Sequence, residues 1–160
     1  MGKVLHSFQN GYAGAISRSI DDIVISLRNA SGGEVAFGAP LFHVSGENAC
    51  RSFNASTSTS DNFVGFAVRV PDKTPENYGL STGSYKANEI MDVLVRGSVV
   101  LPFESSATPG ASVYVRKADG KLVTSAGSEG TTVLLPGVTV RTTRDSSRMA
   151  EVVITERNLI

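Results

Sequence analysis

The sequence predicts an all-β protein: a single compact β-barrel or β-sandwich-like domain with an extended N-terminal arm. Short apolar runs recur at intervals of about 8–12 residues, which is typical of sandwiches and barrels. Turn-forming residues separate these runs, and glycine alone occurs 16 times, enough to supply many tight turns. The clearest runs alternate with a period of two, as a pleated strand does. Because periodicity does not show which strands pair, the barrel and the sandwich remain alternatives.

The arm is expected to cover residues 1–34, ahead of a β domain at residues 35–160. Residues 8–19 are rich in Gly, Ala and Ser, with scattered large side chains that include Tyr12 and Ile16. This composition is typical of a segment that orders against a partner, although a frayed terminus has the same composition.

The stretch of residues 20–27 fits two kinds of local structure. Its apolar residues include a set with helical spacing, for which Ser19 would be the N-terminal cap. Ile23, Ile25 and Leu27 fit the spacing of a strand equally well. Because β-branched residues prefer strands, the strand is favoured.

The run of residues 63–70 has the clearest alternation in the β domain. The pattern predicts that every second side chain lies on one face of a strand. That face would comprise Val64, Phe66, Val68 and Val70.

Glycine and proline indicate irregular strands at two places. Gly38 and Pro40 interrupt the apolar run of residues 35–44, which predicts an irregular or edge strand. Gly97 lies inside the long Val-rich run of residues 90–101 and indicates a bulge or bend.

The second half of the chain predicts a hairpin followed by two further strands. The Asp119-Gly120 pair is a strong hairpin-turn signal between strands at residues 112–116 and 121–124. The closing strands are expected around residues 138–141 and 151–155. Together the patterns predict a core made of Val64, Phe66, Val68, Val93, Val95, Val113, Val115, Val138 and Val140.

Composition limits the partners that the protein can have. The 160 residues correspond to one domain, and 15 basic side chains balance 15 acidic ones. Nucleic-acid binding needs an excess of basic side chains, so no nucleic-acid partner is expected. A low net charge also means that copies of the protein repel one another little, so electrostatics does not oppose self-association. No apolar run is long enough to span a membrane, and the first residues lack the apolar core of a signal peptide. We therefore expect synthesis in a cytoplasm and no membrane partner.

Motifs for catalysis or metal binding are weak. Gly79 to Gly83 match a G-x-S-x-G string, but the strand and helix of a nucleophile elbow are not predicted around them. A metal site of His43, Glu47 and Cys50 would lack a fourth ligand at a recognisable spacing. We predict no catalytic residue, no cofactor and no metal. A small hydrolase that uses Ser81 or His43 is a competing hypothesis, which Ser81→Ala would test.

Two charged segments outside these motifs are also candidates for a function. The Asp21-Asp22 pair lies near Arg18 and Arg28 in the sequence and is interpreted as a solvated patch. Residues 141–148 contain three arginines, which could bind phosphate or an acidic partner, but a solvated hairpin loop is the favoured interpretation.

Five segments in a fixed order carry a resemblance to a known family. They are Ala36–Leu41, Phe63–Arg69, Tyr85–Gly97, Pro109–Leu122 and Pro136–Arg141. Each segment alone is a common glycine-turn-valine string, but their order and spacing from about residue 35 to 154 resemble the phage structural cement, or capsid decoration, family. The first 34 residues match less well.

The resemblance implies a non-enzymatic β domain that binds the outside of a phage capsid and stabilises the shell. The implied partner is the major capsid protein, with self-association, as a trimer for instance, on the capsid surface of the virion. The predicted contact residues are Phe8, Tyr12, Ile16, Arg18, Arg144 and Arg148. The alternative is a phage tail or baseplate component, or another β binding module. Glycan binding is disfavoured because the chain has no Trp, which often stacks on sugars.

Overall fold

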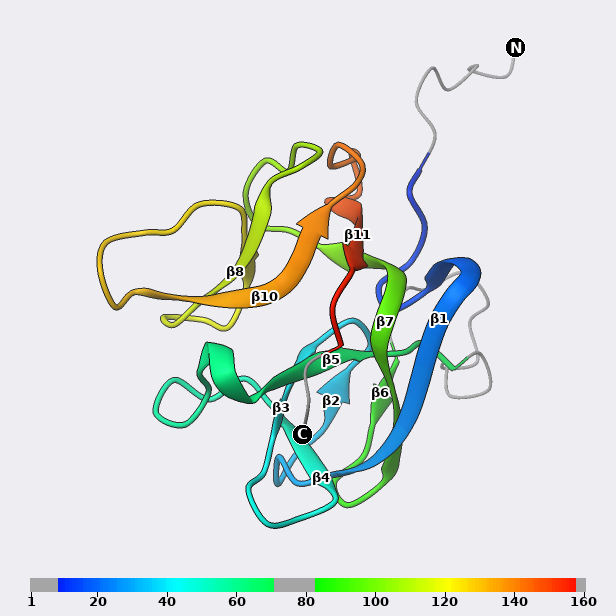
Figure 1. The fold of residues 1–160 in the computed structure, drawn as a ribbon, viewed down its shortest axis with the longest axis vertical. Helices are drawn as coiled ribbons and strands as arrows, with labels where there is room; N and C mark the ends of the chain where they lie inside the picture. The colour runs from blue at the N-terminus through cyan, green and yellow to red at the C-terminus, as the bar shows by residue number, and fades with distance from the viewer. Residues whose placement is uncertain (1–8, 71–82, 158–160) are drawn as a thin grey trace.

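A computed structural model describes residues 9–70 and 83–157 and is almost entirely β-structure, which confirms the predicted fold class (Figure 1). A short 3-10 helix, η1, spans Ser60–Asn62. No helix among the described residues is long and apolar enough to cross a membrane. The strands are β1 (Ile16–Asn29), β2 (Val35–Ala36), β3 (Pro40–His43), β4 (Ala49–Ser52), β5 (Phe63–Ala67), β6 (Ser84–Tyr85), β7 (Ile90–Pro102), β8 (Ser112–Arg116), β9 (Leu122–Val123), β10 (Thr132–Val140) and β11 (Met149–Ile154).

Five strands close into a ring, and four more extend from it. The ring follows the pairings β1–β4, β4–β3, β3–β5, β5–β7 and β7–β1, of which only β1–β4 is parallel. From β7 the sheet continues through β11, β10, β8 and β9, which form the lobe at the upper left of Figure 1. β7 thus pairs with β1, β5 and β11 and joins the ring to the second lobe. β2 and β6 form a separate two-stranded sheet.

Each lobe has its own hydrophobic cluster. The first cluster takes side chains from all five ring strands, among them Leu27, Leu41, Cys50, Val64 and Met91, and so fills the ring. The second contains Phe42, Phe63 and Phe66 from β3 and β5, together with side chains of β7 to β11. It therefore packs the second lobe against the outside of the ring. All nine predicted core residues are buried, which confirms the core prediction.

β5 corrects the predicted alternation of residues 63–70. Phe66 and Val68 lie in the second cluster, whereas Val64 lies in the first and Val70 packs against it. The pairing of β5 with β3 shifts register between Leu41 and Phe42, so the strand has an irregularity at this point. Such an extra residue exchanges the faces on either side of it. Both faces of β5 are buried, so no side of this strand needs polar residues.

The interrupted run at residues 35–44 divides into β2 and β3. Gly38 has a left-handed φ of +78° and turns the chain between the two strands. β3 lies between β4 and β5 and is not an edge strand, but its pairing with β5 shifts register, so the alternative of an irregular strand is confirmed. Proline is tolerated there because Pro40 is the first residue of the strand.

The N-terminal segment lies partly in the sheet. Residues 16–29, which the sequence interpretation assigned to the arm, form β1, so the strand prediction for residues 20–27 is confirmed. β1 pairs along β7, and this pairing between sequence-distant residues is invisible in sequence periodicity. The described residues that precede the sheet are 9–15, and the chain before them lies outside the described residues.

Candidate functional site

The segment before β1 is tied to the loop between β10 and β11. The backbone N–H of Asn10 donates to Oδ2 of Asp145 at 2.7 Å. Its side-chain amide donates to the carbonyl oxygens of Thr143 at 3.0 Å and Met149 at 2.7 Å. The N–H of Gly14 donates to the carbonyl oxygen of Val100 at 2.8 Å. These bonds hold the base of the N-terminal segment against β7 and the loop.

Three of the predicted contact residues follow one another along this segment. Tyr12 is 44% exposed, and the guanidinium of Arg69 lies 4.4 Å from the centre of its ring. Ile16 is half-buried and packs against the second hydrophobic cluster, so much of it belongs to the core. Arg18 donates to Oε1 of Glu151 at 2.8 Å, and the Glu151 side chain is almost buried.

The remaining described contact residues, Arg144 and Arg148, meet at Glu104. Arg144 donates to the carbonyl oxygens of Phe103 and Glu104, at 3.1 and 3.0 Å. Arg148 and Lys121 lie 3.6 and 3.0 Å from Oε2 of Glu104. The pKa of Glu104 is lowered, mainly by its hydrogen bond to Lys121. Phe8, the sixth predicted contact residue, lies outside the described residues.

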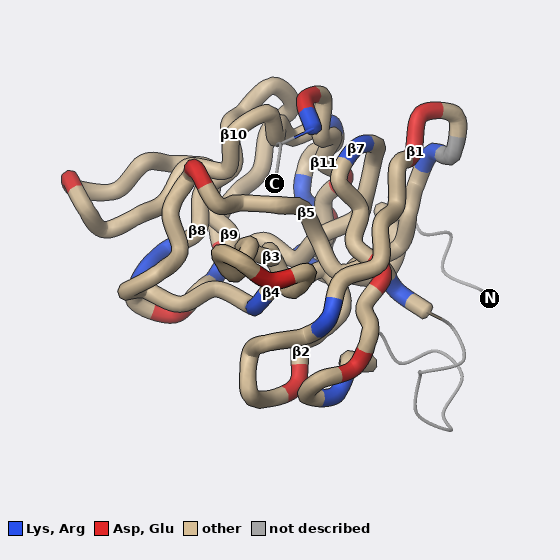
Figure 2. The backbone as a smooth tube through the Cα atoms, turned by 60° about the horizontal axis from the view of Figure 1, so that its bottom comes forward, with Lys and Arg blue, Asp and Glu red and all other residues tan. Residues whose placement is uncertain are grey.

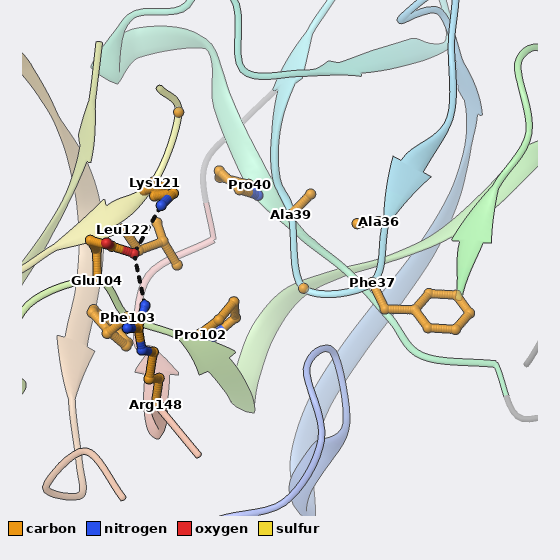
Figure 3. A pocket seen from close by; sticks show the side chains of 12 residues that line it. Ala36, Phe37, Ala39, Pro40, Pro102, Phe103, Glu104, Lys121, Leu122 and Arg148 are labelled. Atoms are coloured by element: carbon orange, nitrogen blue, oxygen red, sulfur yellow. Dashed lines mark hydrogen bonds and ion pairs between the residues drawn. The ribbon is translucent and has the colours of Figure 1, made fainter. Parts of the chain in front are cut away.

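A pocket of about 340 Å³ lies beside this cation cluster, between the two lobes (Figure 3). Segment 36–40 forms one wall, and residues 102–104 with residues 120–122 form the other. Most of the lining is apolar, and Lys121, Glu104 and Arg148 form its charged rim, as Figure 3 shows. The sequence does not indicate this pocket because the walls come from four separate segments. We call it the interlobe pocket.

A second feature protrudes from β1. β1 and β7 pair Arg18 with Ser98 and then Ile23 with Arg96, so residues 19–22 leave the ladder. We call these four residues the β1 excursion. Ile20 within it is fully exposed. Figure 2 shows acidic residues on this turn of β1, which stands away from the rest of the molecule.

The acidic pair in the excursion agrees with the predicted solvated patch at Asp21, whose side chain is 69% exposed, but not at Asp22. Arg96 donates to Oδ2 of Asp21 at 2.8 Å, an ion pair with a residue far away in the sequence. Asp22 is only partly exposed, and its Oδ1 is buried against Gly97. This partial withdrawal from water raises the pKa of Asp22, and the backbone N–H of Ser98 acts in the opposite direction.

The candidate residues for chemistry are not gathered into one site. Cys50 is buried, and this burial raises the pKa of its thiol to about 12. The ring of His43 bonds the carbonyl oxygen of Glu47 at 3.0 Å, while the Glu47 carboxylate bonds Arg28. Across residues 9–70 and 83–157, no three His, Cys, Asp or Glu side chains are placed to hold a metal ion. Ser81 lies outside the described residues.

The chain is similar to phage structural proteins in sequence and in fold. A family model described as structural cement protein (E217 gp24/Pam3 gp6) matches residues 3–155. A chain in the capsid of Myoviridae phage XM1 has a similar fold, with a TM-score of 0.72 and 16% identity over 97% of this chain and 96% of that one. The base of the phi29 head fibre protein gp8.5 aligns with a TM-score of 0.43 and 12% identity over 87% of this chain and 98% of that one. No curated protein matches the sequence.

Proposed function

Because the chain belongs to the phage structural cement protein family, we propose that it is a non-enzymatic virion protein that binds the outside of a capsid and stabilises the shell. The observation that carries this proposal is the extent of the family match, which runs from residue 3 to residue 155. The match therefore includes both lobes and the N-terminal segment. The fold shared with a chain of a phage capsid supports the same architecture.

The proposed partner is the major capsid protein, and the proposed location is the capsid surface of the virion, after synthesis in the host cytoplasm. Two packed lobes that share β7 make a stiff body, which suits a protein that bridges neighbouring subunits. Many equivalent copies on one lattice would act together, because each added contact becomes intramolecular once the shell has formed.

The proposed capsid contact uses the N-terminal segment and the loop that holds it. Phe8, Tyr12, Ile16 and Arg18 would supply the N-terminal part of this contact, and Arg144 and Arg148 the loop part. Tyr12 is half-exposed and aromatic, and aromatic side chains with arginines are enriched at protein interfaces. Arg148 remains 65% exposed despite its ion pair, so its guanidinium can donate to a second carboxylate.

We also propose that copies associate with one another, for which a trimer is the candidate assembly. The net charge of zero supports this because it gives no overall repulsion between copies.

Co-sedimentation with purified capsid shells that lack the protein tests the proposal. The protein should bind expanded shells saturably and bind unexpanded shells less. Tyr12→Ser and a chain lacking residues 2–8 should both bind expanded shells more weakly. Leu134→Ser is the matched control, because Leu134 is exposed to a similar extent on β10. Absence of binding to any shell, with binding to tail assemblies instead, would overturn the capsid proposal.

A further inference from the structure

The β1 excursion presents an isoleucine to solvent next to two residues that contact β7. Asp21 is ion-paired to Arg96 on β7 at 2.8 Å. Asp22 packs against Gly97 so closely that a Cβ at position 97 would lie 2.2 Å from its Oδ1. Both contacts hold the excursion against β7, while Ile20, the residue before Asp21, is not covered by any of the described residues. Ile23 and Val24, which follow the excursion on β1, are also exposed, so this part of the strand offers an apolar surface to a partner.

The interlobe pocket has the complementary properties. Its walls include Ala39, Pro40, Pro102 and Leu122, which offer an apolar surface to an aliphatic side chain, whereas the Phe37 ring points away from the pocket (Figure 3). Its volume of about 340 Å³ is more than enough for one isoleucine and part of the neighbouring backbone. Pro102 and Ala36 are exposed, so the walls can be reached from solvent.

The charges of the two features are opposite. At the excursion, Asp21 is paired with Arg96 while Asp22 lies against the backbone of Gly97 and Ser98, so the two carboxylates leave one negative charge in excess. At the pocket rim, Lys121 and Arg148 share one carboxylate, Glu104, which leaves one positive charge in excess. Docking the excursion in the pocket would bring these excess charges together, and such complementarity selects partner and orientation.

The excursion cannot fill the pocket of its own chain. Gly97 supports the excursion and Pro102 lines the pocket, and both residues belong to β7. Five residue steps along the extended strand separate them by roughly 17 Å. Because the same continuous strand fixes both features, the partner in such a contact must be another molecule.

We propose that the β1 excursion of one copy inserts Ile20 into the interlobe pocket of a second copy. This inference rests on the proposed self-association and identifies the surfaces through which two copies would meet. The contact joins two different surfaces, so it is heterologous, and repeating it closes a ring or continues as a chain. Asp21 and Asp22 would then face Lys121 and Arg148 of the second copy's rim.

Sedimentation velocity over a range of protein concentrations tests the contact. The wild type should form oligomers as concentration rises, and Ile20→Ser should remain monomeric. Ile90→Ser is the matched control, because Ile90 is also exposed but lies outside both features. Ala36→Trp should fill the pocket and give the same loss, with Ala118→Trp on the β8–β9 turn as its control.

Mixing the two defective variants gives the sharpest readout. Ile20→Ser keeps an intact pocket and Ala36→Trp keeps an intact excursion, so together they retain one functional contact. An equimolar mixture should form a one-to-one dimer and nothing larger. A mixture that remains monomeric, while the wild type assembles, would overturn the inference. Circular dichroism of Ala36→Trp ensures that a folding defect is not mistaken for loss of the contact.

The outcomes separate this contact from the wider proposals. Wild-type oligomers that Ile20→Ser leaves intact would overturn this contact and leave self-association standing. A wild type that stays monomeric at every concentration would overturn both. Binding of the wild type to shells is measured separately and tests the capsid proposal alone.

The charge component has its own test. Arg148 has a left-handed φ of +65°, a conformation that asparagine tolerates well, so Arg148→Asn removes the charge without new backbone strain. This variant should associate more weakly, and its association should depend less on salt. Lys117→Asn is the control, because Lys117 is a cation outside the pocket rim. An unchanged salt dependence in Arg148→Asn would contradict the charge complementarity.

Discussion

Gly97 and Asp22 are in such close contact that no side chain fits between them. A Cβ on Gly97 would lie 2.2 Å from Oδ1 and 3.1 Å from Cα of Asp22. Gly97 also has a φ of +117°, which residues with a side chain rarely adopt. The glycine in the middle of β7 therefore lets β1 bend outward into its excursion at this point.

Replacing this glycine should destabilise the protein. Gly97→Ala introduces both backbone strain, worth about 1–3 kcal/mol, and the clash with Asp22. We expect the free energy of unfolding in urea to fall by at least this amount. Gly33→Ala is the control, since nothing lies within 4 Å of a Cβ there. Equal stability of the two variants would contradict the role assigned to Gly97.

Phe66 should be one of the most sensitive core positions. It is fully buried on β5 and makes an edge-to-face contact with Phe63, with ring centres 5.4 Å apart. Phe66→Ala should cost roughly 3–5 kcal/mol by denaturant titration, because it leaves a cavity in the second cluster. Leu134→Ala, at a more exposed position, should cost much less. A loss below about 1 kcal/mol for Phe66→Ala would refute this placement.

Asn10 should control how firmly the N-terminal segment is held. Asn10→Ala removes two side-chain hydrogen bonds to the loop, each worth about 0.5–1.5 kcal/mol. Amide hydrogen exchange of residues 10–15 should become faster, while exchange in β5 should hardly change. Gln9→Ala serves as the control because its one side-chain bond, to Ser147, is long at 3.4 Å. Unchanged protection of Gly14 would contradict the anchoring role.

The ion pair between Arg116 and Asp119 in the β8–β9 turn should stabilise the fold at neutral pH, and acid should remove this stabilisation. Arg116 donates to Asp119 at 3.0 Å and lowers the pKa of Asp119 to about 2. A carboxyl whose folded pKa is depressed stabilises the fold above its unfolded pKa of about 3.9, and this contribution disappears as the pH falls toward 2. Asp119→Asn should therefore lower stability at pH 7 and reduce the loss between about pH 4 and pH 2. Urea titrations at both ends of this range measure the effect, with Asp61→Asn as the control. If the free energy of unfolding fell equally in the wild type and in Asp119→Asn between pH 4 and pH 2, the role assigned to Asp119 would be contradicted.

Cys50 should be chemically inert in the folded protein. Its side chain is buried in the first cluster, and its pKa is raised to about 12, so almost no thiolate is present at neutral pH. A thiol-specific aromatic disulfide reagent should react only as fast as the protein unfolds. The same protein in urea should react at once. Rapid reaction of the native protein would show that Cys50 is accessible.

Local features of the fold could be predicted from the sequence where they depend on near neighbours. The hairpin at Asp119-Gly120 and the strand at residues 112–116 follow from turn chemistry and from alternation, and both are present. The irregularity at Gly97 was also predictable, because glycine inside a Val-rich strand has few other uses.

Features that depend on distant pairing could not be predicted. The ring closes where Arg28 and Asn29 of β1 pair in parallel with Ala49 and Cys50 of β4, and periodicity contains no sign of that register. The opposite placement of Val64 and Phe66 follows from one shifted pairing with β3. The interlobe pocket likewise arises only when β7 brings the two lobes together, and Ile20 is exposed because residues 19–22 leave the β1–β7 ladder.

The thermal stability of expanded capsid shells tests the central claim most directly. Shells that lack the protein would be titrated with it, and their disruption temperature would be measured by calorimetry at each occupancy. A cement protein should raise this temperature as its sites fill, up to a plateau at saturation. Saturable binding with no rise in the disruption temperature would contradict the stabilising role and leave only attachment to the shell.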